Sequence, residues 1–145
     1  MSQHNVTLLL GSNIGSPELN IAEAVTRIGR EVGVVEAQST PMHTEPVEFV
    51  TNNNFCNIAL RIKTGLSPIS LLNRIKKIEV EMGRAEDSLI TKKYEDRIID
   101  IDVVLYGDIK FLSARLQIPH QKHLYERKFS RELLSDLSNT LKTQI

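Results

Sequence analysis

The chain has 145 residues, of which 41% are hydrophobic and 25% are charged, values typical of one globular domain rather than of a long disordered segment. Its 18 basic and 18 acidic residues give a formal net charge of zero, which excludes a general attraction to nucleic acid or to an anionic membrane. Cys56 is the only cysteine, so an internal disulfide is excluded and a reducing compartment is favoured. No apolar run approaches the roughly 20 residues of a membrane span, and we expect a soluble, cytoplasmic protein.

The first part of the chain alternates short apolar runs with turn residues. Residues 6–10 predict a strand that stops at Gly-Ser-Asn, and Ser16-Pro17 is typical of a helix N-cap and first turn. Residues 34–39 predict a second strand. Residues 42–54 carry few periodic apolar positions and predict a long loop, and residues 55–62 predict the next strand.

The second part repeats this alternation. Ser67-Pro68 predicts the start of a second helix, whose apolar stripe ends at Gly83. Residues 84–96 predict another long loop, residues 97–106 a strong strand, and residues 130–141 a final helix. The order β-α-β-β-α-β predicts an α+β, ferredoxin-like fold, with an antiparallel sheet and helices on one face. We expect residues 1–145 to form a single domain.

The clearest chemical pattern is Asp100-Ile-Asp102 within the last predicted strand. Because side chains alternate along a strand, Ile99, Ile101, Val103 and Leu105 should share one face, and the two aspartates the other. Two carboxylates on one face repel, and a cation relieves this; Mg²⁺ prefers such oxygen ligands together with phosphate oxygens. The alternative is a solvated strand face, which needs no metal.

Known nucleotide-binding motifs are missing. The chain has no G-x-x-x-x-G-K-[ST] sequence, no G-x-G-x-x-G sequence and no kinase signature. Binding of ATP would therefore require metal, arginine, lysine and histidine contacts on another scaffold.

Several motifs, in a fixed order, resemble those of the 6-hydroxymethyl-7,8-dihydropterin pyrophosphokinase family. The resemblance runs from about residue 6 to residue 129, and its most diagnostic part is R-x-x-D-x-D followed by Pro-His. The motifs are Leu-Gly-Ser-Asn at 10–13, Thr44-x-Pro46, Phe55-x-Asn57, Ile78-Glu79 with Gly83-Arg84, Arg97 to Asp102, Leu105-Tyr106-Gly107 and Ile118-Pro119-His120.

This resemblance implies a ferredoxin-like enzyme that transfers pyrophosphate from ATP to the hydroxymethyl group of the pterin, releasing AMP in folate biosynthesis. It implies that Asp100 and Asp102 hold two Mg²⁺ ions, and that Arg84 and Arg97 join them in catalysis. The residues implied to contact ATP are Glu79, Arg84, Arg97, Arg115, His120 and Arg127. Those implied to contact the pterin are Thr44, Val47, Phe55, Asn57, Tyr94, Asp100 and Phe129, with the two phenylalanines on either side of the ring. ATP and the pterin are the only partners expected, and we expect a monomer.

Three departures from the family pattern concern the loops. Lys93-Tyr94-Glu95-Asp96-Arg97 stands where Arg-Trp-Gly-Pro-Arg is common, so Tyr94 takes the aromatic place, and the segment before it is longer than usual. Arg127 lies one residue further from His120 than usual. The sequence also ends at Ile145, without the family's usual C-terminal segment.

Apart from the resemblance, several residues have simpler interpretations. Cys56 is expected to be a small buried apolar residue, and His4, His43 and His123 to be structural or solvated. Glu79 lies at the margin of an apolar stripe, where it is either paired or a surface residue. Two other functions use the same features: a metal-dependent phosphoesterase with Glu79 and His120 as further ligands, and a non-catalytic ferredoxin-like binding module.

Overall fold

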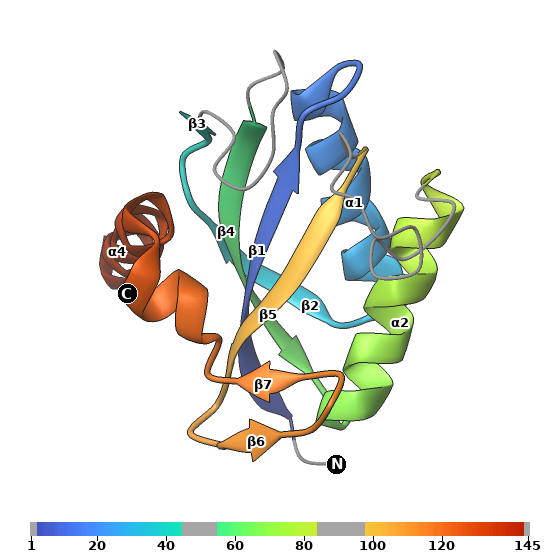
Figure 1. Cartoon of the computed structure of the whole chain (residues 1–145), viewed down its shortest axis with the longest axis vertical. Helices are drawn as coiled ribbons and strands as arrows, with labels where there is room; N and C mark the ends of the chain where they lie inside the picture. The colour runs from blue at the N-terminus through green and yellow to red at the C-terminus, as the bar shows by residue number, and fades with distance from the viewer. Residues whose placement is uncertain (1–2, 45–54, 84–97, 144–145) are drawn as a thin grey trace.

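The computed structural model describes residues 3–44, 55–83 and 98–143. Figure 1 shows a twisted sheet with α1 and α2 along one side and α4 on the other. The strands of the sheet are β1 (His4–Ser12), β2 (Val34–Gln38), β3 (Met42–Thr44), β4 (Phe55–Thr64) and β5 (Asp100–Tyr106), and β6 (Phe111–Leu112) and β7 (Gln117–Ile118) form a separate hairpin. The helices are α1 (Pro17–Glu31), α2 (Pro68–Glu81), the short π-helix η1 (Lys122–Glu126) and α4 (Lys128–Thr143).

The sheet has the spatial order β2-β4-β1-β5, with β3 also paired to β4, and every pairing is antiparallel. The long strands and the first two helices follow one another as β-α-β-β-α-β, as the sequence predicted. The prediction of an α+β fold with an antiparallel sheet is therefore confirmed. Because β5 lies at an edge of this sheet, its outer backbone groups are available to other parts of the chain.

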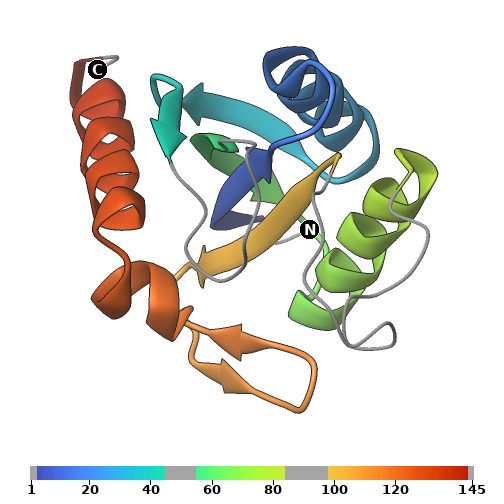
Figure 2. The same ribbon diagram turned by 45° about the horizontal axis from the view of Figure 1, so that its top comes forward.

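Two hydrophobic cores lie on opposite faces of the sheet. The larger joins the inward side chains of β1, β4 and β5 to α1 and α2, with Leu8, Ile58 and Ile75 fully buried. The smaller lies beneath α4 and contains Leu9, Ala59, Val104, Leu133 and Leu137. Figure 2 shows the sheet between α4 and the other two helices. The two helices of the β-α-β-β-α-β motif, α1 and α2, lie on one face as predicted, and α4, which follows the motif, packs on the face that the aspartates share.

Other local predictions also differ from the structure. Met42–Thr44 was predicted as loop but pairs with β4 as β3. The sequence did not indicate this strand, because three residues are too few to show periodicity. The last strand begins at Asp100 rather than at residue 97. Its pairing with β1 shifts between Thr7 and Leu8, so Leu105 packs in the core under α4, not with Ile101 and Val103 as predicted. Such a bulge reverses the alternation of the side chains that follow it.

No helix among the described residues is both long and apolar enough to cross a membrane.

Candidate active site

Asp100 and Asp102 lie on the same face of the edge strand β5, both partly exposed. They share this face because Ile101 and Val103, which alternate with them, are buried in the larger core. The predicted arrangement of the two carboxylates is therefore present, and Asp102 has neighbours that the sequence did not identify.

Asp102 is held by a buried histidine. The Nε2–H of His123 donates to Asp102 Oδ2 over 2.7 Å, and His123 Nδ1 lies 2.6 Å from the hydroxyl of Ser130. His123 and Ser130 are both buried. Burial by itself would raise the pKa of Asp102, but the hydrogen bond and positive charge of His123, with the charges of His120 and Arg127, lower it to about 2. Asp102 is therefore a carboxylate throughout the neutral range.

The π-helix η1 explains how these residues meet. The five residues Lys122–Glu126 form a single π turn, closed by a 2.8 Å hydrogen bond from Arg127 N–H to Lys122 O. A π turn joins residues five positions apart by a hydrogen bond, one position more than an α turn does. It brings Arg127 close enough to lower the pKa of both Asp102 and His120.

His120 lies over the outer edge of β5, with its backbone N–H donating to Val104 O at 3.0 Å. Its ring nitrogen Nδ1 accepts a hydrogen bond from the backbone N–H of His123 at 3.3 Å, and the two rings are 4.2 Å apart between centroids. Burial is the largest cause that lowers the pKa of His120. The negative charge of Asp102 opposes this effect, and the positive charges of His123, Arg127 and Lys122 lower the pKa further. With Nδ1 as an acceptor, the neutral ring carries its proton on Nε2 and can donate it to a ligand.

Glu79 is a buried anchor between α2 and β5. Its side chain is only 1% exposed, and Oε2 accepts a 2.8 Å hydrogen bond from Ile101 N–H. Lys76 Nζ lies 3.2 Å from Oε1. The interpretation of Glu79 as a surface residue is wrong, because it pairs with the free edge of β5 between the two aspartates. Its predicted contact with ATP stays a prediction.

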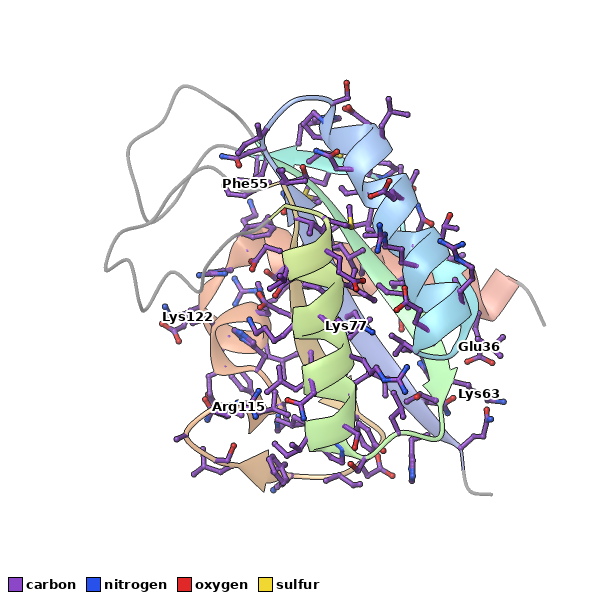
Figure 3. The ribbon with its side chains drawn as sticks, turned by 90° about the vertical axis from the view of Figure 1, so that its right-hand side faces the viewer. Glu36, Phe55, Lys63, Lys77, Arg115 and Lys122 are labelled. Carbon is purple, nitrogen blue, oxygen red and sulfur yellow. The ribbon has the colours of Figure 1, made fainter. Side chains whose placement is uncertain are left out.

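A groove of about 330 Å³ runs along this edge, between α2, β5, β7 and η1. Asp102 and His120 line it together with three cationic side chains, those of Lys76, Arg115 and Lys122. In Figure 3, Arg115 and Lys122 lie on the same side of α2. Arg115 is oriented by a 2.8 Å hydrogen bond from Nη2 to Asn73 Oδ1. Clustered cations beside a carboxylate can bind a polyphosphate with its metal.

A second group of predicted residues lies on β3 and β4. Asn57 is buried, and its Nδ2 donates to Thr44 Oγ1 over 2.8 Å. Gly11 of β1 pairs with Asn57 on one side and with Asp100 on the other. A Cβ at Gly11 would lie 2.7 Å from Asn57 Oδ1 and 3.6 Å from the ring of Phe55. The glycine therefore leaves room for Asn57 and Phe55, which explains its place in the motif.

The two predicted aromatic residues are half-buried. Phe55 begins β4, on the same face of the sheet as Asn57, toward the end of the sheet in Figure 3. Phe129 lies in the first turn of α4, packs against the smaller core, and makes an edge contact of 6.4 Å with the ring of His123. Both side chains thus belong to the face that carries Asp100 and Asp102. Their stacking on a pterin stays a prediction.

Four predicted residues lie outside the described parts of the chain: Val47, Arg84, Tyr94 and Arg97. Three residues of the site were missed by sequence reasoning, namely Lys76, Lys122 and His123. Lys76 and Lys122 stand in no motif, and His123 was assigned a structural role. The spacing His120-x-x-His123 was the one available signal, since a helical turn brings residues three apart together.

Residues 7–139 match the model of the 7,8-dihydro-6-hydroxymethylpterin-pyrophosphokinase family. The chain is 41% identical to the folate synthesis bifunctional protein of Arabidopsis thaliana over 136 residues, which are 93% of this chain and 27% of that protein. It is 32% identical to the 2-amino-4-hydroxy-6-hydroxymethyldihydropteridine pyrophosphokinase of Bacillus subtilis, over 90% of this chain and 75% of the relative. The corresponding enzyme of Aquifex aeolicus is 38% identical, over 79% of this chain and 69% of the relative.

The chain spans only about a quarter of the length of the plant relatives that it matches. Among solved structures, it resembles the HPPK-DHPS protein of Plasmodium falciparum with pteroate, with a TM-score of 0.67 and 16% identity, over 94% of this chain and 41% of that one. At that identity the likeness concerns the fold alone. The family match over residues 7–139 and the identity to the B. subtilis and A. aeolicus enzymes carry the assignment: this chain belongs to the 7,8-dihydro-6-hydroxymethylpterin-pyrophosphokinase family.

Proposed function

We propose that this chain transfers pyrophosphate from ATP to the hydroxymethyl group of 6-hydroxymethyl-7,8-dihydropterin and releases AMP, a step of folate biosynthesis. The observation that carries the proposal is the cationic groove beside Asp102. Asp102 lies on the same sheet face as Phe55, Asn57 and Asp100. The family membership supports it. We further propose that residues 1–145 act as one domain, as a monomer, in the cytoplasm.

The groove between α2 and η1 is the proposed site of the triphosphate. Lys76, Arg115 and Lys122 supply positive charge along its wall, and His120 supplies a neutral N–H donor. Arg127 adds charge from the end of η1. These groups would neutralise the charge on the phosphate oxygens, which is the main contribution that phosphoryl transfer needs from a protein. They would form no covalent bond to the phosphate. Arg84 and Arg97 remain predicted contributors, and Glu79 would act by holding β5 in place.

Asp100 and Asp102 would hold Mg²⁺, with two ions expected from the resemblance. The donor set fits, because two carboxylates share one strand face and Asp102 is ionised throughout the neutral range. When bound, the metal supplies charge neutralisation for the phosphate oxygens. His123 would contribute as a positioning residue, since its hydrogen bond to Asp102 Oδ2, backed by Ser130, limits rotation of that carboxylate.

The pterin would lie at the other end of the same face. Phe55 and Phe129 offer aromatic surfaces for the flat ring, and Asn57 and Thr44 offer polar groups for its edge. The hydroxymethyl group would then point to Asp100, which faces Asn57 across Gly11. Val47 and Tyr94 remain predicted contacts of the pterin.

In the proposed reaction the hydroxymethyl oxygen forms a bond to the β-phosphorus of ATP. The bond between this phosphorus and the oxygen that bridges it to the α-phosphorus breaks, AMP leaves with that oxygen, and the hydroxyl proton passes to solvent. The protein contributes mainly alignment of the two substrates and electrostatic stabilisation.

The test is to incubate the protein with ATP, Mg²⁺ and the hydroxymethyl pterin and to identify the nucleotide product. We expect AMP and the pterin diphosphate in equal amounts, and no AMP without the pterin. Formation of ADP or of free phosphate would instead indicate a phosphotransferase or a phosphoesterase. Binding without turnover would indicate the non-catalytic module.

A further inference from the structure

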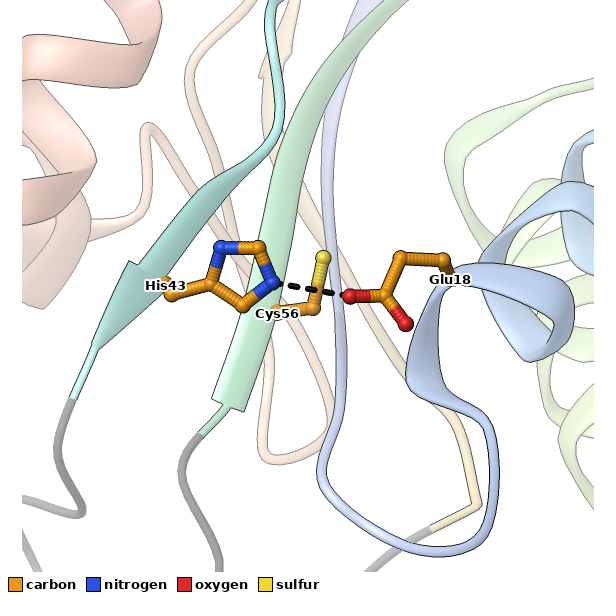
Figure 4. Close-up of side chains that lie close together, drawn as sticks. All are labelled: Glu18, His43 and Cys56. Atoms are coloured by element: carbon orange, nitrogen blue, oxygen red, sulfur yellow. Dashed lines mark hydrogen bonds and ion pairs between the residues drawn. The ribbon is translucent and has the colours of Figure 1, made fainter.

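A second cluster of potential metal ligands lies outside the groove and takes no part in the proposed reaction. It contains Glu18, His43 and Cys56, here called the Cys56 cluster. Their carboxylate, imidazole and thiol atoms all lie within 4.8 Å of one another, and His43 Nε2 is 2.8 Å from Glu18 Oε1. Figure 4 shows the three side chains converging from β3, β4 and the start of α1.

The fold brings these residues together in a defined way. His43 and Cys56 are direct partners in the pairing of β3 with β4, so their side chains lie on the same face. Because side chains alternate, this face is opposite to that of Phe55 and Asn57, and it is the face that α1 covers. Glu18 in the first turn of α1 completes the cluster.

The three donors differ in exposure. Cys56 is 1% exposed, and its thiol has no hydrogen-bond partner among the described residues. The side chains of His43 and Glu18 are 60% and 59% exposed. A buried sulfur beneath a solvent-facing nitrogen and oxygen leaves an open position on the outer side. Burial and then the charge of Glu18 raise the pKa of the Cys56 thiol, and a bound cation would offset both effects.

We propose that Glu18, His43 and Cys56 form a binding site for a divalent cation of the zinc class, with water as the fourth ligand. Thiolate, imidazole and carboxylate are the ligands that Zn²⁺ takes in proteins, and three of them with one open position form a recognised arrangement. Mg²⁺ is excluded as the occupant, because it prefers oxygen ligands. Binding forms the metal–sulfur bond and releases the thiol proton to solvent.

Metal binding at this site would link β3 and β4 to the start of α1. Thr44 follows His43 directly, and Phe55 precedes Cys56, so the linked strands are those that carry the proposed pterin contacts. The site would therefore stabilise the pterin side of the molecule without occupying the groove. A metal that binds only the folded protein also raises its melting temperature.

The experiment uses Co²⁺ as a spectroscopic probe for the zinc site, with the full chain reduced and freed of metal. We expect one equivalent of Co²⁺ to produce the near-ultraviolet charge-transfer absorption of a cobalt–thiolate bond, and one equivalent of Zn²⁺ to abolish it. The other metal-ligand cluster among the described residues, Asp102 with His120 and His123, contains no sulfur. The absorption therefore distinguishes the two clusters.

Substitutions test each ligand. Cys56→Ser should abolish the absorption, and the exposed changes His43→Gln and Glu18→Gln should each weaken Co²⁺ binding at least about tenfold while the protein stays folded by circular dichroism. His123→Gln, the matched control in the other cluster, should leave the absorption unchanged. The proposal is overturned if Co²⁺ binds without the thiolate absorption, if it does not bind at micromolar concentrations, or if His43→Gln and Glu18→Gln bind it like the wild type.

Discussion

Two three-residue clusters, one on each face of the same sheet, contain similar donor atoms in opposite electrostatic surroundings. Asp102, His120 and His123 lie beside a groove with several cations, and Asp102 has a pKa lowered to about 2. In the Cys56 cluster burial raises the pKa of the thiol, and the negative charge of Glu18 raises it further. The comparison shows that donor spacing alone does not define a ligand. Surrounding charge favours a phosphate–magnesium complex at the first cluster, and sulfur favours a softer metal at the second.

Removing a carboxylate from β5 should lower the rate of turnover more than any other change. Asp102→Asn and Asp100→Asn should each lower kcat on the order of 10³-fold, because a Mg²⁺ ligand is lost and the charge that develops on the phosphate oxygens is less well stabilised, while both variants stay folded. Steady-state assays at several Mg²⁺ concentrations check this. Activity within tenfold of wild type in either variant would argue against a Mg²⁺ site on Asp100 and Asp102.

The next effect concerns Phe55, which precedes Cys56 on β4 and lies on the opposite face of the sheet. Phe55→Ala should weaken pterin binding by about 10-fold to 100-fold, because a stacking surface is lost, and should change ATP binding much less. Calorimetry with each ligand separately measures both effects. Equal losses for the two ligands, or a large fall in melting temperature, would show that Phe55 is only a core residue.

A smaller effect on the metal requirement is expected from the histidine that holds Asp102. His123→Gln should raise the Mg²⁺ concentration needed for half-maximal activity by about tenfold, because Asp102 loses the partner that orients it. The control is His4→Gln, since His4 contacts the ring of Tyr106 and belongs to neither cluster. An unchanged Mg²⁺ requirement in His123→Gln, with normal kcat, would leave His123 a purely structural residue.

A smaller effect is expected on the wall of the groove. Lys122→Ala should raise the KM for ATP by about threefold to tenfold, with little change in kcat or in pterin affinity, because a partly solvated phosphate contact contributes about 1 kcal/mol. Lys63→Ala is the matched control, because Lys63 pairs with Glu36 on β2, away from the groove. Equal KM values in the two variants would argue against the groove as the triphosphate site.

The smallest effect is on stability in acid. The pKa of Asp102 lies below its ordinary value of 3.8, so its ionised form stabilises the folded state above about pH 4, and this contribution is lost as the pH falls from about 4 to about 2. The difference in free energy of unfolding between wild type and Asp102→Asn should therefore shrink by about 0.5 to 1 kcal/mol between pH 6 and pH 3, allowing for partial exposure. Urea titrations measure it. Cys56→Ser should show no such change, since a thiol does not titrate in that range.

Local patterns in the sequence determined the element order and the shared face of Asp100 and Asp102, because strand alternation and helix periodicity depend on near neighbours. The ordered motifs also identified the family, which the comparisons confirmed. Motif position further pointed to Glu79, whose burial between α2 and β5 the structure then explained.

The contacts between residues from distant parts of the chain depend on the three-dimensional packing. His123 reaches Asp102 because η1 forms a π turn beside the edge of β5, and Lys76 and Lys122 share a groove although 46 positions separate them. His43 meets Cys56 through the register of a three-residue strand, and Glu18 joins them through the packing of α1. Such contacts follow from strand pairing and helix packing between residues that are far apart in the sequence. The local periodicity of a sequence does not indicate them.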